Sequence, residues 1–278
     1  MDTERSLVPA AKRSLGQNFL VHGSAARKIA ALVCHDSPEA VVELGAGTGN
    51  LTVELAKRSG RVIAFEIDER LVHWHERQHV LPENVELRRA DILKISYQAL
   101  AAELGNIVRV AGNLPYNIST QVVFSVCRQS SSVSEAFFLF QREVAERIVS
   151  SPGTKTYGVL SVVAQYSARV RKEFDLSPDC FRPRPKVWSS LVSFDFCQGH
   201  GDEDVDYDFF IRTVKASFSQ RRKKIINCLA QFFRKKKPEM EAVLIEAGIN
   251  PGARAEVLDV ADFVTLSRVL LKKMEEAR

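Results

Sequence analysis

The chain has 278 residues, of which 45% are hydrophobic and 26% charged, and its formal net charge is +5. This composition is ordinary for a globular protein and is sufficient for one large domain and one small domain. No apolar run reaches about 18 residues and residues 1–14 lack the apolar segment of a secretory signal, so no membrane span or signal peptide is expected. The five cysteines are scattered without a CxxC pair, which indicates reduced thiols in a cytoplasmic protein and no structural zinc.

The first 200 residues alternate short apolar strands with helical segments. Residues 1–14 are expected to form a mobile arm, followed by a helix over about 24–34. Strands are predicted at 40–44, 61–66, 85–89, 106–111 and 135–140, with helices beginning near residue 51 and covering about 69–79, 120–128, 143–149 and 157–166. Two more strands, at 170–176 and 189–196, are predicted to close the sheet as an antiparallel pair. The alternation predicts an α/β fold with a parallel, doubly wound, Rossmann-like sheet.

An acidic, glycine-containing segment at residues 198–208 is predicted to be a linker. The pattern beyond it is helical throughout, so the expected domains are 1–200 and 201–278. Between residues 209 and 238 there are ten Lys or Arg and no Asp or Glu, an asymmetry that suggests a nucleic-acid partner.

Four consecutive cations are candidates for contact with RNA. They are expected to start a helix whose apolar residues, such as Ile225 and Leu229, pack inward; the cations are Arg221, Arg222, Lys223 and Lys224. A solvated helix face is the alternative interpretation. A second basic cluster, residues 234–237, is expected on the same element without acids to neutralise it, which favours an RNA backbone contact.

A glycine-rich turn follows the first strand after Glu43. Gly45 and Gly47 let the backbone turn sharply and let a ligand approach it, because neither carries a Cβ. The spacing is neither the dinucleotide fingerprint nor a P-loop, and it looks like the S-adenosylmethionine loop of Rossmann-like methyltransferases. Glu66 ends the next strand, where it can accept hydrogen bonds from ribose hydroxyls, and Asp91 ends the third, where it can bind an adenine amino group. The alternative is a NAD-type or purely structural turn.

The turn Asn113-Leu114-Pro115-Tyr116 follows the fourth strand. The Asn113 side-chain oxygen and the Leu114 carbonyl can accept the two N–H groups of an adenine amine, which makes its nitrogen more nucleophilic without a strong base. Pro115 has no N–H to compete and fixes the turn, and Tyr116 offers a face on which an extruded base can stack. The plain alternative is a strand-to-helix turn with a buried tyrosine.

Two further features invite a functional interpretation. Phe181 opens a rigid, basic, proline-spaced loop and is a candidate second aromatic against the target base, or else a core residue beneath that loop. His73, His75 and His79 form an H-x-H-x-x-x-H pattern, but no carboxylate or cysteine cluster supports them and their helix is expected in the outer layer. No metal site is therefore expected.

Several longer motifs occur in a fixed order along the chain: QNFL at 17–20, ELGAGTG at 43–49, NLPY at 113–116, FQREVAERI at 140–148, YGVLS at 157–161, FRPRPKV at 181–187 and FSQRRK at 218–223. On these motifs the chain resembles the ribosomal RNA adenine dimethyltransferases of the KsgA type over about residues 12–230. The resemblance implies transfer of four methyl groups from S-adenosylmethionine to N6 of two adjacent adenines, in the terminal hairpin loop of small-subunit ribosomal RNA. It also implies a Rossmann-like catalytic domain, a small helical domain and a 30S-type particle as partner.

The resemblance assigns roles to individual positions. For the cofactor, it implies contacts by Asn18 and Leu20, the methionine end at Gly45, the ribose at Glu66 and the adenine at Asp91. For the substrate, it implies that Asn113 lies between the cofactor and the target amine. It also implies that Tyr116 and Phe181 stack on the two faces of the target base. Trp188 departs from the pattern, because the family usually has a small or polar residue there, and the last forty residues match only weakly.

Three alternatives remain at this stage. A large-subunit RNA methyltransferase of the macrolide-resistance type shares the N-terminal motifs, although residues 219–229 fit the small-subunit enzymes better. A non-catalytic ribosome-assembly factor is the second. A NAD-linked oxidoreductase, the third, disagrees with the glycine spacing. The enzyme is expected to act as a monomer.

Overall fold

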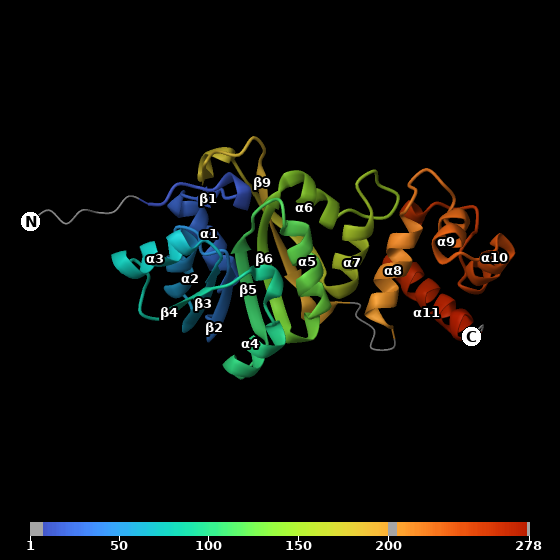
Figure 1. Cartoon of the computed structure of the whole chain (residues 1–278), viewed down its shortest axis with the longest axis horizontal. Helices are drawn as coiled ribbons and strands as arrows, with labels where there is room; N and C mark the ends of the chain where they lie inside the picture. The colour runs from blue at the N-terminus through green and yellow to red at the C-terminus, as the bar shows by residue number, and fades with distance from the viewer. Residues whose placement is uncertain (1–7, 200–204, 277–278) are drawn as a thin grey trace, which may run out of the picture. The chain divides into compact units, whose positions relative to one another are not determined.

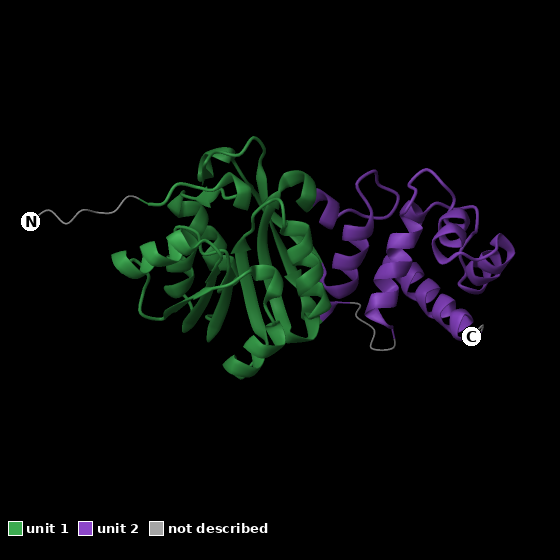
Figure 2. Ribbon diagram, viewed as in Figure 1, with its two compact units in different colours: residues 1–145, 170–197 green, residues 146–169, 198–278 purple. Residues whose placement is uncertain are grey.

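The computed structural model describes residues 8–199 and 205–276. The chain forms two compact units, residues 1–145 with 170–197 and residues 146–169 with 198–278 (Figure 2). This division differs from a single boundary at residue 200, because the helix α7 (Val159–Ser167) belongs to the second unit. There the ring of Tyr166 stacks on Phe210 of α8 (Tyr207–Ser217), with centroids 4.2 Å apart. The predicted linker at 198–208 lies partly outside the described residues.

Unit 1 is built on a seven-stranded sheet of order β4-β3-β2-β5-β6-β9-β7. The strands are β2 (Ala40–Leu44), β3 (Arg61–Glu66), β4 (Val85–Arg89), β5 (Val108–Asn113), β6 (Val133–Gln141), β7 (Arg169–Leu176) and β9 (Ser189–Asp195). The strands β2 to β6 run parallel to one another, and β9 pairs antiparallel with β6. The chain order reverses beside β2, which makes this edge of the sheet the expected place for a ligand. The predicted α/β, Rossmann-like fold is confirmed.

Helices cover both faces of this sheet, as Figure 1 shows. One face carries α1 (Gly23–Val33) and α2 (Asn50–Ala56), and the other carries α4 (Tyr97–Leu104) and α5 (Ser119–Arg128). Because both faces are covered, β2 and β3 are buried at every position after their first residue, as continuous apolar runs in a parallel sheet predict. The helix α3 (Glu69–Gln78) connects β3 to β4.

The N-terminal segment is held in place by long-range contacts. Residues 19–20 form β1 (Phe19–Leu20), which pairs antiparallel with β8 (Phe181–Arg182). Earlier in the chain, the Lys12 ammonium lies 3.3 Å from a carboxylate oxygen of Asp68, at the start of α3. The prediction of a mobile arm is therefore wrong for the part around Lys12, and residues 1–7 lie outside the described chain.

Unit 2 is helical and contains the two basic clusters, residues 221–224 and 234–237. The helix α6 (Arg142–Ile148) crosses from unit 1 into unit 2. After α7 and α8 come α9 (Ile225–Phe233), α10 (Lys237–Glu246) and α11 (Val260–Glu276). The basic residues 221–224 do not start α9, contrary to prediction. They form the turn before it, because Lys224 is extended and the Ile225 N–H donates to the Ala253 carbonyl at 2.8 Å. Ile225 and Leu229 are buried, as expected.

The second basic cluster also lies outside α9. Arg234 adopts a left-handed conformation, with φ of +54°, which ends α9, and Lys237 already begins α10. The two clusters therefore flank one helix instead of sharing it. No helix in the described part of the chain is long and apolar enough to cross a membrane.

Candidate active site

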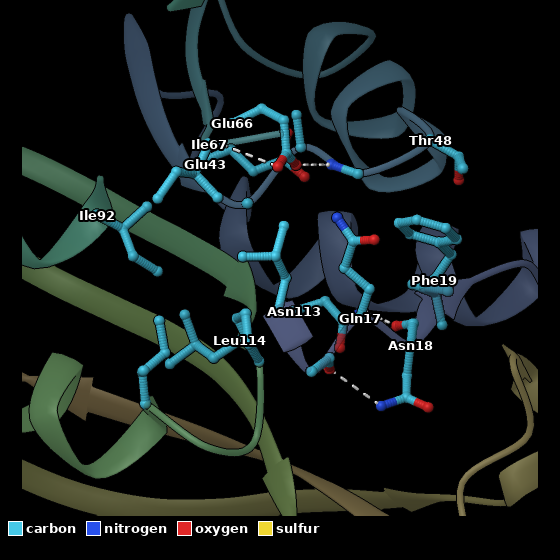
Figure 3. Close-up of a pocket in the computed structure, with 18 of the residues that line it drawn as sticks. Gln17, Asn18, Phe19, Glu43, Thr48, Glu66, Ile67, Ile92, Asn113 and Leu114 are labelled. Carbon is cyan, nitrogen blue, oxygen red and sulfur yellow. Dashed lines mark hydrogen bonds between the residues drawn. The ribbon is translucent and has the colours of Figure 1, made fainter. Parts of the chain in front are cut away.

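A cavity of about 250 Å³ lies in unit 1, and residues from the carboxyl ends of β2, β3 and β5 line it (Figure 3). The N-terminal segment 14–20 and the turn after β4 complete its wall. Most of the predicted site residues meet here: Asn18, Leu20, Gly45, Gly47, Glu66, Asp91, Asn113, Leu114 and Pro115. Of the predicted catalytic and cofactor residues, Tyr116 and Phe181 do not line it.

The glycine loop forms one wall of the cavity with its backbone. Gly45 and Gly47 have φ of +83° and +54°, a region of backbone conformation that residues with a side chain rarely adopt. The N–H groups of Gly45 and Ala46 both donate to the Phe65 carbonyl at 2.9 Å, which joins the loop to β3. A Cβ at Gly45 would meet only a backbone oxygen at 3.9 Å, so the loop is open there, whereas a Cβ at Gly47 would lie 3.1 Å from the Phe19 ring. The loop is thus a cradle in which a ligand can approach the backbone.

Glu66 braces this loop from the end of β3. One carboxylate oxygen accepts the Gly47 N–H at 2.9 Å, and the other accepts the N–H groups of Ile67 and Asp68 at 2.9 and 2.8 Å. Burial raises the pKa of the Glu66 carboxyl, and these three hydrogen bonds oppose the shift. Sequence reasoning predicted a ribose contact for Glu66 but missed its bracing role. Both roles are compatible, since Glu66 also lines the cavity.

His75 holds the same loop from behind. It lies on α3 with 3% of its surface exposed, and its Nε2 is 2.9 Å from the Gly47 carbonyl oxygen. Since a carbonyl only accepts, Nε2 carries the proton, and the buried Nδ1 has no hydrogen-bond partner. Burial lowers the pKa of His75. The helix itself lies in the outer layer, as expected, but the burial of His75 against the glycine loop was not expected. The described residues contain no group of three or more potential metal ligands.

Glu43 is a buried carboxyl that faces the cavity. Only 1% of its surface is exposed, and its Oε2 has no hydrogen-bond partner. Burial raises the pKa of Glu43 to about 8, so the carboxyl is protonated at neutral pH. An unpartnered polar atom at a glycine-lined wall fits a ligand that brings its own hydrogen-bonding groups.

The raised pKa of Glu43 predicts a pH-dependent stability. Its folded-state pKa of about 8 exceeds the usual value of 4.5, so the folded state binds more protons between these values. Stability should therefore fall as the pH rises through this range, by up to about 1.4 kcal/mol per pH unit. Glu43→Gln should flatten this part of the profile in thermal or urea unfolding. An unchanged slope in the variant would mean that Glu43 is already ionised in the folded protein.

Asn113 is oriented by the N-terminal segment. Its Nδ2 donates to the Asn18 carbonyl at 2.7 Å, and this contact fixes the amide plane (Figure 3). The donor nitrogen faces Asn18, so Oδ1 is turned the other way and is available as an acceptor. Asp91, by contrast, caps a short turn, where its Oδ1 accepts the Leu93 N–H at 3.0 Å while the residue still lines the cavity.

The two predicted stacking aromatics differ in their surroundings. Tyr116 is half-buried beside the cavity, where its hydroxyl and the Ser189 hydroxyl form a hydrogen bond of 2.7 Å, and burial raises its pKa. Phe181 is fully buried in the hydrophobic core, because its strand pairs with β1 and places it opposite Leu20. The structure thus corrects the prediction that Phe181 stacks on the target base. Trp188, next to Ser189, is 47% exposed.

Comparisons with known proteins identify the family of the chain. A family model described as ribosomal RNA adenine dimethylase matches residues 8–272. The protein named ribosomal RNA small subunit methyltransferase A from Moorella thermoacetica is 40% identical, over 96% of this chain and 94% of its own. Its namesake from Desulfotalea psychrophila is 35% identical, over 95% and 93%.

Two solved structures show the same fold. A dimethyladenosine transferase from Plasmodium falciparum has a TM-score of 0.73 at 23% identity, covering 93% of this chain and 98% of its own. The 23S rRNA methyltransferase ErmE has a TM-score of 0.63 at 24% identity, covering 91% and 99%. On the family model and the full-length relatives, the chain belongs to the ribosomal RNA adenine dimethylase family.

Proposed function

We propose that the protein transfers methyl groups from S-adenosylmethionine to N6 of two adjacent adenines in the 3′-terminal hairpin loop of small-subunit (16S) ribosomal RNA. The products are N6,N6-dimethyladenosines, and the enzyme contributes to small-subunit biogenesis in the cytoplasm. The observation that carries this proposal is the Asn113 amide, held by Asn18 at the rim of a glycine-walled cavity. The names of the curated relatives supply the small ribosomal subunit as target.

The cavity fits S-adenosylmethionine through its donor and acceptor groups. The backbone of Gly45 and Gly47 provides the cradle, Glu66 is available to ribose hydroxyls, Asp91 to the adenine amino group, and the buried Glu43 oxygen to a donor group of the ligand. When bound, this cofactor supplies a methyl group on a positively charged sulfur, which makes the methyl electrophilic.

The protein's own contribution to the transfer is positioning. Asn113 Oδ1 and the Leu114 carbonyl accept the two N–H groups of the adenine amine, which increases the electron density on its nitrogen. The bond from Nδ2 to Asn18 holds this amide before the substrate arrives, so little reorganisation is needed during the reaction. Tyr116 follows in the same turn and offers an aromatic face to an extruded base.

Binding of the RNA backbone is assigned to Arg221, Arg222, Lys223 and Lys224. All four side chains are exposed in the turn before α9. Such contacts fix the position of an RNA but do not read its sequence. The choice of the two adenines therefore depends on the cavity and on the shape of the RNA. Action as a monomer stays a prediction.

The decisive experiment is mass mapping of methyl groups. Small-subunit particles that lack the modification are incubated with the protein and S-adenosylmethionine, with large-subunit RNA as a parallel substrate. The proposal expects dimethylation of two adjacent adenines in the small-subunit RNA alone. Methylation of the large-subunit RNA would support the macrolide-resistance alternative, and binding to particles without methylation would support a non-catalytic assembly factor.

A thermal-unfolding comparison separates the cofactor classes. A ligand that binds only the folded state adds RT ln(1 + [L]/Kd) to the free energy of unfolding, and this raises the melting temperature. S-adenosylmethionine is expected to stabilise the protein and NAD to leave it unchanged. If NAD raised the melting temperature and S-adenosylmethionine did not, the glycine loop would be a dinucleotide-binding loop.

A further inference from the structure

A second hollow lies in unit 2, and it shares no lining residue with the cofactor cavity. It is an open groove of about 500 Å³, lined by Lys223, Asn227, Ala230, Gln231, Lys235 and Lys237. Three of these residues are ammonium groups, two are amides, and none is a carboxylate. Only Lys223 belongs to the basic turn already assigned to RNA.

The groove has a helix face as its floor. Asn227, Ala230 and Gln231 are spaced i, i+3 and i+4, so they lie on one side of α9. Lys223 enters from the turn before the helix. Lys235 and Lys237 enter from the other end, because the left-handed Arg234 turns the chain back toward α10. Positive charge therefore flanks the floor at both ends.

These charges are mostly uncompensated. Lys235 lies 3.6 Å from a carboxylate oxygen of Glu239, but both side chains are partly exposed, and such pairs contribute at most about 1 kcal/mol. Among the described residues, no carboxylate lies within ion-pair distance of Lys223 or Lys237. The groove can thus exchange one weak internal contact for a stronger anionic ligand.

The amides add donors to the same surface. Gln231 Oε1 accepts the Gln220 side-chain N–H at 2.6 Å, so the outward group of the Gln231 amide is its NH₂. An open groove with ammonium groups at both ends and amide donors on its floor suits an elongated polyanion. A small enclosed ligand would need a deeper, more apolar pocket.

We propose that this groove binds the phosphodiester backbone of the RNA substrate, as a second footprint beyond the turn 221–224. The inference depends on the proposed function for the identity of the RNA. The groove positions the substrate and takes no part in methyl transfer. It also gives a role to Lys235 and Lys237, two members of the second basic cluster at residues 234–237.

The test removes the two cations that belong to the groove alone. In Lys235→Gln/Lys237→Gln, the affinity for small-subunit ribosomal RNA, titrated from low to high salt, should lose about one unit of log–log salt slope per cation. At about 0.15 M salt this corresponds to binding about 10- to 30-fold weaker. KM for RNA should rise while kcat and S-adenosylmethionine binding stay unchanged.

A charge-matched control distinguishes the groove from overall electrostatics. Arg212→Gln/Lys272→Gln removes the same charge from exposed positions on α8 and α11 and should leave the salt slope almost unchanged. An unaltered slope in the groove variant, or an equal loss in the control, would overturn the inference. If the wild-type protein binds the RNA but transfers no methyl group to it, the proposed function fails. The comparison of salt slopes still shows whether the groove binds RNA.

Discussion

Replacement of Asn113 by alanine should slow methyl transfer by about two to three orders of magnitude while S-adenosylmethionine still binds. The variant removes the side-chain oxygen that accepts an N–H group of the adenine amine, and with it the preorganised amide held by Asn18 at 2.7 Å. Loss of one preorganised polar group at a reacting centre typically lowers kcat by about 10²- to 10³-fold. Incorporation of labelled methyl groups into unmethylated small-subunit RNA measures the loss, and calorimetric titration measures cofactor affinity.

The matched control for this variant is Asn106→Ala. Asn106 is exposed just before β5, at the opposite end of the strand that leads to Asn113, and should tolerate the change with normal turnover. Wild-type-like turnover in Asn113→Ala would refute the amide mechanism. If cofactor affinity fell in proportion to kcat/KM, Asn113 would instead act mainly in shaping the cavity.

Glu66→Ala should have the largest effect on the cofactor loop. It removes the acceptor of three backbone N–H groups, those of Gly47, Ile67 and Asp68, at 2.8 to 2.9 Å. Hydrogen bonds to charged groups are worth about 1.5 to 3 kcal/mol each, and since water can replace some of them we expect a loss near 3 kcal/mol in unfolding free energy. Cofactor affinity should fall about 100-fold or more, because the loop and the ribose contact are lost together.

Glu69→Ala provides the comparison for Glu66. Glu69 lies three residues after Glu66, and its carboxylate forms an exposed ion pair with Arg89 at 2.7 Å. Exposed pairs of this kind contribute about 1 kcal/mol or less, so unfolding free energy and cofactor affinity should change little. Equal losses in the two variants would show that Glu66 acts only through general stability.

Local patterns were sufficient to predict the sheet and much of the cavity. Buried apolar runs such as β2 and β3 are recognisable because both faces of a parallel sheet are covered. Residues at their carboxyl ends meet at one edge, so Glu66 and Asn113 were correctly expected to line one site. The loop glycines were recognisable by their spacing, and they have positive φ values that residues with a side chain rarely adopt.

Several features that the sequence did not indicate depend on contacts between residues far apart in the chain. Phe181 is buried because it pairs with Leu20 in a two-stranded sheet, and nothing near Phe181 in the sequence indicates that partner. The hydrogen bond from His75 reaches Gly47, which is 28 residues away. The start of α9 is shifted by the bond from Ile225 to Ala253. Composition and periodicity describe local preference, and these contacts override it.

The contact between Asn18 and Asn113 also links the exchange of the cofactor to the orientation of the catalytic amide. Asn18 belongs to the segment that closes one wall of the cavity, and the same residue holds the amide that receives the substrate amine. Any opening of this segment that lets a spent cofactor leave also releases the amide. Four successive methylations would therefore require the catalytic amide to be reset after each exchange, which makes cofactor loading and readiness for the next transfer a single step.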